Sequence, residues 1–207
     1  MKKITYDTKK YNFKEIIEKL FQDKLENLHQ NIEILDVNTD QSTVFHKKYY
    51  EGVAHGPFFK IYENFVKEII QPAIEEEILF QAIPTFRVHM KGNLAVGAFH
   101  RDSDYSHNSN EVNIFLPLTN AYGNNTIWVE SEFGKEDFAP MNTNYGEIHI
   151  WDGANLKHGN KLNDTELTRV SFDFRVLKKS NYQIDNIKKS FTNETKMEIG
   201  GYWKELL

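Results

Sequence analysis

The spacing of apolar residues changes near residue 83, and this change limits the possible folds more than any other feature of the sequence. Before that point, apolar side chains recur at three- and four-residue steps, as along one face of an α-helix. One helix is predicted within 11–30 and a second after Pro57, which Pro72 should kink or restart. Over 83–177 the apolar spacing becomes two, which is typical of β-strands. The predicted strands are Thr85–Met90, Val96–His100, Glu111–Leu118, Thr126–Glu130, Glu147–Trp151 and Arg169–Leu177.

Turns rich in glycine, asparagine, aspartate and serine separate these short strands, so we expect a mainly β fold of the sandwich or barrel type. Because the helices precede the strands, they should buttress one sheet and not form a separate domain. A chain of 207 residues fits one domain with a sizeable core. The expected layout of 1–207 is a helical buttress over 1–82, a β core over 83–177 and an extension over 178–207. This extension could be an extra strand, a lid or a loose end.

The composition removes several classes of site. The chain has no cysteine, which excludes disulfides, Cys-ligated zinc, iron–sulfur clusters and a cysteine nucleophile. Any metal must be held by His, Asp or Glu, and eight histidines are available. The formal net charge of −5 disfavours a nucleic-acid partner. We find no signal peptide and no apolar run that could cross a membrane, so we expect a cytoplasmic protein with no membrane partner.

One short motif could bind a metal. His100 and Asp102 end a predicted strand, where residues two apart point to the same face. His158, which follows the strand over 147–151, can add a second imidazole. Two imidazoles and one carboxylate on one face of an octahedron leave three positions open, which is the pattern of non-haem Fe(II) sites. His149 lies within the strand over 147–151 and is the alternative to His158 as the second histidine ligand.

The last predicted strand begins with a pattern suited to binding a carboxylate. Arg169 and Ser171 should share one strand face, where a guanidinium and a hydroxyl can hold the same carboxylate. Arg175 lies on that face too and is the alternative anchor. On the preceding strands, Arg87 and His89 could line the same cavity.

At this point a family resemblance is clear. Residues 83–177 resemble the Fe(II)- and 2-oxoglutarate-dependent oxygenases of the double-stranded β-helix (jelly roll) fold. The order of His-x-Asp, a distal histidine and Arg-x-Ser is similar to the signature of that superfamily. The step of eleven residues from His158 to Arg169 resembles the phytanoyl-CoA and ectoine hydroxylase groups. The segments NLAVGAFHRDSDYSH, EVNIFLPLT, HGN and TRVSFDFR look like a small bacterial branch of streptomycin-biosynthesis oxygenases.

This resemblance implies a site and a reaction. His100, Asp102 and His158 would hold Fe(II), and Arg169 with Ser171 would anchor the cosubstrate 2-oxoglutarate. Asn113 falls where such enzymes often place a polar contact to the oxoacid, and Asn160 does so with a weaker match. Dioxygen would then oxidise a substrate, with release of succinate and CO2.

The substrate is expected to be small and polar. The segment 103–110 follows the first two candidate ligands and consists mostly of short polar residues, with Tyr105 and His107 among them. Trp128 and Arg87 could add a stacking wall and a positive contact. The resemblance implies a sugar, an aminocyclitol or an amino-acid-like molecule. Two other functions would also fit a β fold with clustered histidines: a cupin-like, metal-dependent isomerase or epimerase, and a non-catalytic carbohydrate-binding jelly roll.

Overall fold

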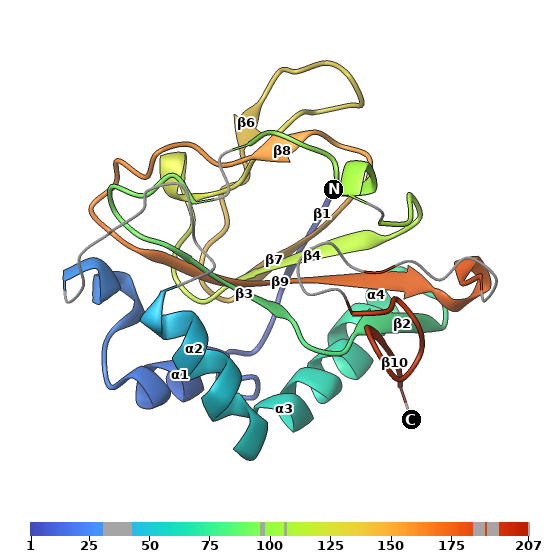
Figure 1. The fold of residues 1–207 in the computed structure, drawn as a ribbon, viewed down its shortest axis with the longest axis horizontal. Helices are drawn as coiled ribbons and strands as arrows, with labels where there is room; N and C mark the ends of the chain where they lie inside the picture. Colours follow the sequence, from blue (N-terminus) through green and yellow to red (C-terminus); the bar gives the residue numbers. More distant parts are fainter. Residues whose placement is uncertain (31–42, 96–97, 106, 184–188, 190–194, 207) are drawn as a thin grey trace.

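The computed structural model of the chain describes all residues except 31–42, 96–97, 106, 184–188, 190–194 and 207. Two sheets and a group of helices form three layers, with the large sheet in the middle and the small sheet on the side opposite the helices (Figure 1). The large sheet has the order β1-β7-β4-β9-β2-β10, with β3 also paired to β9, and the small sheet has the order β6-β5-β8. The strands are β1 (Lys2–Thr5), β2 (Ile78–Gln81), β3 (Thr85–His89), β4 (Val112–Pro117), β5 (Trp128–Val129), β6 (Ala139–Pro140), β7 (Glu147–Trp151), β8 (His158–Gly159), β9 (Arg169–Lys178) and β10 (Trp203–Glu205).

Strand β9 is the centre of the large sheet. It pairs antiparallel with β4 on one side and with β3 and then β2 on the other. Its residues alternate between two environments, as the sequence predicted. Val170, Phe172, Phe174 and Val176 belong to the core shared with the helices, whereas Arg169, Ser171, Asp173 and Arg175 occupy the opposite face, toward the small sheet.

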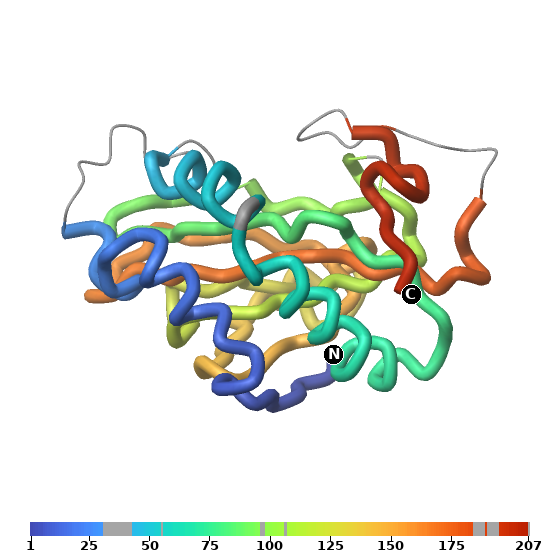
Figure 2. Tube along the Cα trace, turned by 90° about the horizontal axis from the view of Figure 1, so that it is seen from below, coloured from blue at the N-terminus to red at the C-terminus, as the bar shows by residue number. Residues whose placement is uncertain are grey.

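The helices cover one face of the large sheet, and the region 1–82 that contains them also supplies β1 and β2 to that sheet. They are α1 (Phe13–Phe21), α2 (Val44–Gly52), α3 (Phe58–Phe65) and α4 (Gln71–Ile74). Figure 2, viewed from the helical side, shows α1 to α3 lying across the strands. The contact is largely aromatic. The ring of Phe172 lies 5.1 Å from Phe58, 5.4 Å from Tyr49 and 6.1 Å from Phe13 of the helices, measured between ring centroids. It also lies 5.7 Å from Phe86 of the neighbouring strand β3.

Both predicted helices are interrupted. The first ends at Phe21, because Gln22 adopts a left-handed conformation with φ 59°, and a 3₁₀ turn at Leu25–Gln30 follows. After α3 the chain forms a π-helical turn at Val66–Ile70 and resumes as α4. Pro72 lies directly beyond this turn, where its missing N–H cannot continue the regular helical pattern. The sequence did not indicate α2.

The predicted strands over 85–90, 111–118, 147–151 and 169–177 are confirmed as β3, β4, β7 and β9, and that over 126–130 is reduced to the two residues of β5. The predicted strand Val96–His100 was not found as such. Its first two residues lie outside the described ones, and within 98–100 only His100 forms a β-bridge. Strands β1 and β2 were not predicted.

In the C-terminal extension, β10 pairs antiparallel with β2, so this part is an extra strand of the large sheet. It packs in a small core of Leu79, Leu177, Met197, Tyr202 and Trp203. Within the described residues, no helix is long and apolar enough to cross a lipid bilayer.

The aromatic contact between β9 and the helices can be tested by Phe172→Ala. Loss of this fully packed ring should lower the free energy of unfolding by about 3–5 kcal/mol, because a cavity remains at the helix–sheet interface. Urea denaturation measures the change. Ile83→Ala, at a position that is 51% exposed, should change it by no more than about 0.5 kcal/mol. Equal losses in the two variants would contradict the assigned core.

A candidate metal centre between the two sheets

The three predicted metal ligands meet in space. One ligand atom from each of His100, Asp102 and His158 can be chosen so that all three lie within 4.8 Å of one another. The local arrangement differs from the predicted one, in which His100 and Asp102 shared a strand face. Instead, His100 forms a two-way backbone bridge with His158 of β8, with N–O distances of 2.8 and 2.9 Å, and Asp102 begins a 3₁₀ turn at Asp102–Tyr105.

Both imidazoles are oriented by backbone carbonyls. The Nδ1 of His100 lies 2.8 Å from the carbonyl oxygen of Ala98, and that of His158 lies 2.9 Å from that of Leu156. Each Nδ1–H can donate to its carbonyl, which leaves the lone pair on Nε2 for a metal. The two Nε2 atoms lie 3.6 and 3.7 Å from Oδ1 of Asp102. Burial lowers the pKa of His158 and so favours the neutral form that binds metals.

The other oxygen of Asp102 is held by side chains from the large sheet. Oδ2 accepts hydrogen bonds from Asn113 Nδ2 at 2.7 Å, from Arg175 Nη2 at 2.7 Å and from Arg175 Nε at 2.9 Å. Burial alone would raise the pKa of Asp102, but the Arg175 guanidinium, the histidines and the Asn113 amide together lower it well below its ordinary value. The carboxylate is therefore charged, with Oδ2 engaged and Oδ1 directed at the histidines.

Arg175 is itself fixed by residues that the sequence did not connect with the site. Its Nη1 donates to the hydroxyl of Tyr202 at 3.4 Å, and that hydroxyl donates to Oε1 of Gln81 at 3.0 Å. Oε2 of Glu111 lies 3.8 Å from Nε of Arg175. Tyr202 directly precedes β10, so the C-terminal segment contributes to the support of Asp102. No short-range signal could have indicated this contact, because residues 175 and 202 meet only through tertiary folding.

The hydrogen bond from Asn113 to Asp102 was not predicted from the sequence. Oδ1 of Asn113 is buried and has no hydrogen-bond partner among the described residues. A Cβ atom on Gly153 would lie 2.5 Å from its Nδ2, so a glycine is needed there to leave room for the amide. The expected contact of Asn113 with an oxoacid stays a prediction.

Arg169 and Ser171 lie side by side on β9, as the sequence predicted. Arg169 is buried, and its Nη1 donates to Ser171 Oγ at 2.9 Å while its Nε donates to the carbonyl of Asn125 at 3.0 Å. Arg87 is opposite Ser171 in the β3–β9 register, and its Nε lies 3.3 Å from Oδ2 of Asp173. Arg169 and Arg175 of β9 and Arg87 of the neighbouring β3 thus bring three guanidinium groups to this side of the large sheet.

The other two histidines considered above, His89 and His149, have hydrogen-bond partners outside the candidate metal centre. His89 is opposite Arg169 in the register, with its ring nitrogens 3.2 Å from the carbonyl oxygen of Asn125 and 2.8 Å from that of Asn93. Burial and the neighbouring Arg169 lower the pKa of His89 to about 3, so its ring is neutral. His149 lies on β7 with Nδ1 2.9 Å from Thr143 Oγ1, and it is not part of the three-residue group found among the described residues.

A cavity of about 290 Å³ joins these groups. It contains the three candidate ligands together with Arg169 and Arg175, so the metal-binding residues and the guanidinium groups face one space. Trp128, a possible wall, does not line it, and its indole donates to the carbonyl of Gly123 instead. Trp151 lines the cavity, with its ring 4.8 Å from the ring of His158. The cavity is also lined by Arg87, Tyr105, His107, Asn113 and Asn160.

The chain is similar to a known protein over nearly its whole length. It is 37% identical to the streptomycin biosynthesis protein StrG of Streptomyces griseus over 202 residues, which cover 97% of this chain and 96% of that protein. No protein-family model matches the chain.

Solved structures with low sequence identity have a similar fold. HygX from Streptomyces hygroscopicus, solved with nickel and 2-oxoglutarate bound, is 11% identical with a TM-score of 0.55, covering 86% of this chain and 82% of that one. The nickel complex of the non-heme monooxygenase ThoJ is 10% identical with a TM-score of 0.52, covering 90% and 75%. The chain therefore belongs to the family of StrG, and its fold is similar to the folds of HygX and ThoJ.

Proposed function

We propose that the protein is an Fe(II)- and 2-oxoglutarate-dependent dioxygenase that hydroxylates a small polar metabolite and releases succinate and CO2. One observation carries this proposal: two imidazoles and one carboxylate converge in the cavity that also contains the buried guanidinium of Arg169. We further infer that the two sheets wind as a double-stranded β-helix, which agrees with the two-sheet architecture and the helical buttress.

The chain's own donor atoms fit Fe(II). His100 and His158 would bind through Nε2, since their Nδ1 atoms face carbonyls, and Asp102 would bind through Oδ1, since Oδ2 is engaged by Asn113 and Arg175. Two nitrogens and one oxygen form the ligand set that non-haem Fe(II) prefers, and three further positions stay open. It is important that Asp102 binds through one oxygen only, because its second carboxylate oxygen would occupy one of the three open positions.

Arg169 and Ser171 are suited to the far carboxylate of 2-oxoglutarate. A guanidinium can make two parallel charge-assisted hydrogen bonds to a carboxylate, and the adjacent hydroxyl can add a third. Arg175 is less suited, because its Nε and Nη2 already donate to Asp102. This placement of an oxoacid also favours the oxygenase over a cupin-like isomerase or a carbohydrate-binding jelly roll, neither of which needs the Arg169–Ser171 pair.

With dioxygen, bound iron and 2-oxoglutarate supply an oxidant that can insert oxygen into an unactivated C–H bond. The contributions of the chain are positional. His100 and His158 are held in one tautomer and Asp102 is held charged, so the three donor groups are arranged before a metal binds.

The substrate should be a polar metabolite such as a sugar, an aminocyclitol or an amino-acid-like molecule. Tyr105 and His107 from the segment 103–110 line the cavity, and the ring of Tyr105 lies 5.3 Å from that of His100. Hydroxyl and imidazole groups at this position supply hydrogen bonds and little apolar surface. The role of the relative StrG in streptomycin biosynthesis is consistent with this class.

The metal assignment predicts different outcomes for two histidines on neighbouring elements. His158→Ala should weaken Fe(II) binding by roughly 100-fold or more, since a first ligand should count for at least as much as the supporting groups around a metal. His149→Ala should leave Fe(II) binding close to that of the unchanged protein. Anaerobic Fe(II) titration with metal analysis measures both. Retention of iron by the His158 variant, with loss in the His149 variant, would move the distal ligand to His149.

The oxoacid assignment predicts a selective loss. Arg169→Ala should weaken 2-oxoglutarate binding by about 2–5 kcal/mol, which is roughly 30-fold to a few thousandfold, because a buried charge partner is removed. Iron should stay bound, because Asp102 is held by Asn113 and Arg175, whereas Arg169 donates to Ser171 and to the carbonyl of Asn125. The measurement is anaerobic titration of oxoacid into the Fe(II) protein, followed by its visible charge-transfer band.

Arg175→Met is the comparison for this experiment. It should mainly disturb Fe(II) binding, through Asp102. If instead Arg169→Ala titrates like the unchanged protein and the Arg175 variant loses the oxoacid selectively, then Arg175 is the anchor.

A further inference from the structure

The cavity at the metal centre is small for what it would have to contain. Its volume of about 290 Å³ lies at the lower limit of ordinary pockets for one small ligand, which measure about 300–1,000 Å³. Under the proposed function, it holds 2-oxoglutarate as well as the carbon to be oxidised. The rest of any substrate larger than a few atoms must therefore occupy another space.

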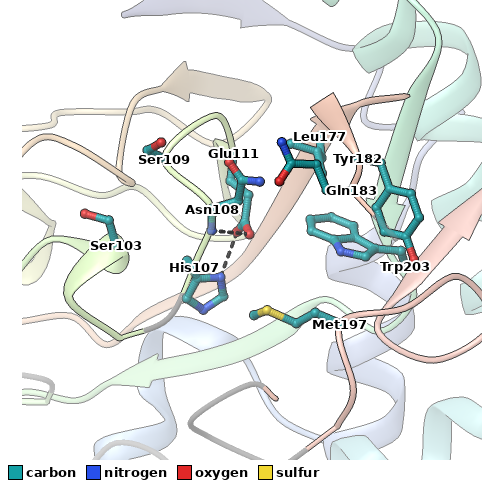
Figure 3. A pocket seen from close by; sticks show the side chains of 10 residues that line it. All are labelled: Ser103, His107, Asn108, Ser109, Glu111, Leu177, Tyr182, Gln183, Met197 and Trp203. Atoms are coloured by element: carbon teal, nitrogen blue, oxygen red, sulfur yellow. Dashed lines mark hydrogen bonds and ion pairs between the residues drawn. The ribbon is translucent and has the colours of Figure 1, made fainter. Parts of the chain in front are cut away.

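A second pocket of about 270 Å³ lies beside the first. His107 lines both, and Ser103, at the edge of the second pocket, directly follows the candidate ligand Asp102. Figure 3 shows side chains of the segment 103–109 on one side of this space, with Trp203 and Tyr182 on the other. The two pockets together have a volume within the ordinary range for a ligand site.

The polar wall of the second pocket is rich in hydrogen-bond acceptors. His107 donates Nδ1–H to Oε2 of Glu111 at 2.7 Å, so in the neutral ring its Nε2 carries a lone pair. The backbone N–H of Asn108 donates to Oε1 of Glu111 at 2.9 Å, which fixes the loop around the carboxylate. The Glu111 side chain is only 1% exposed, so its carboxylate contributes a negative charge behind this wall and orients the groups in front of it. Such a wall favours a ligand with many N–H and O–H donors.

The charges of the two pockets differ in sign. Three arginines (Arg87, Arg169 and Arg175) and two aspartates (Asp102 and Asp173) line the cavity at the metal centre, so one positive charge is in excess there. Among the described residues that line the second pocket there is no lysine or arginine, and Glu111 supplies a carboxylate. Phosphate and carboxylate groups are usually recognised by guanidinium or ammonium groups. The second pocket therefore disfavours an anionic ligand and accepts a neutral or cationic one.

The opposite wall is apolar and aromatic. It is built from Leu177, Met197 and Trp203, which pack together as a small core, with Tyr182 against them. Sugar and cyclitol rings have C–H faces that can pack on such a wall while their substituents face the acceptors.

We propose that this second pocket is the subsite for the part of the substrate remote from the oxidised carbon, and that it binds an amino- or hydroxyl-substituted ring without phosphate. The inference rests on the proposed oxygenase function and narrows its substrate class. It disfavours nucleotide-linked and phosphopantetheine-linked forms, whose phosphates would lie near Glu111 in a pocket with no lysine or arginine among its described lining residues.

Three two-ring probes of different charge test this inference: neamine, which is cationic, trehalose, which is neutral, and trehalose 6-phosphate, which is anionic. The measurement is succinate formation by the Fe(II) protein with 2-oxoglutarate and air, with and without each probe. Neamine or trehalose should raise the rate by roughly tenfold over the substrate-free rate, and the phosphate ester should have little effect. No stimulation by neamine or trehalose, or the strongest stimulation by the phosphate ester, would overturn the inference.

A pair of variants locates the effect. Both Ser109 and Asn110 are exposed, but only Ser109 lines the second pocket. Ser109→Trp should fill the pocket and raise the KM of the stimulating probe by roughly tenfold, while Asn110→Trp should leave it unchanged. The dissociation constant of 2-oxoglutarate, from anaerobic titration, should be equal in both. Equal KM values in the two variants would overturn the subsite.

These outcomes are distinguishable from failure of the proposed function. If the protein binds Fe(II) and 2-oxoglutarate and forms succinate slowly without substrate, the oxygenase function stands whatever the probes do. If it forms no succinate and shows no charge-transfer band, the function and the subsite both fall.

Discussion

The contact between Asp102 and Arg175 is the interaction on which the rest of the site depends. Asp102 belongs to the turn beside the small sheet, and Arg175 belongs to the central strand of the large sheet, so their ion pair at 2.7 Å connects the two layers. Burying two charges is costly, and the cost is offset only where geometry is good and the remaining donors and acceptors are satisfied. Asn113, Tyr202 and the nearby Glu111 provide that support. Loss of Arg175 would therefore leave a buried carboxylate without its countercharge, and the metal-binding oxygen would no longer be fixed.

Strand β9 combines stability and chemistry through its alternation. One face contributes Phe172 and its neighbours to the aromatic core under the helices, and the other contributes Arg169, Ser171 and Arg175 to the cavity. A sheet covered by helices on one side usually exposes polar residues to water on the other. Here the small sheet covers that second face, so its polar side chains are enclosed and find partners within the protein. This enclosure makes a strand with four polar residues on one face suited to bind a cosubstrate.

The sequence predicted those features that depend on local periodicity. Alternation was sufficient for β3, β4, β7 and β9, and the spacing of two placed Arg169 beside Ser171. It was insufficient for β1 and left β10 as one of three possibilities, because these are short edge strands whose pairing is decided by their partners and not by an apolar pattern. His100 and Asp102 do not share a strand face as expected. His100 is placed by a β-bridge to His158, and Asp102 is placed by the 3₁₀ turn that follows. The contacts of Asp102 with Asn113 and of Arg175 with Tyr202 depend on strand register and on the return of the C-terminal segment, which no local pattern encodes.

That return also connects the two pockets. Tyr202 donates to Gln81 and accepts from Arg175 behind the metal-binding carboxylate, while the next residue, Trp203, forms part of the wall of the second pocket. Glu111 is shared in the same way, since its carboxylate holds the loop of the second pocket and lies 3.8 Å from Arg175. A group bound against Glu111 would therefore change the electrostatic surroundings of Arg175 and, through it, of Asp102. Arg175, whose guanidinium holds the metal-binding carboxylate, is thus in contact with Tyr202 and close to Glu111, two residues at or next to the second pocket.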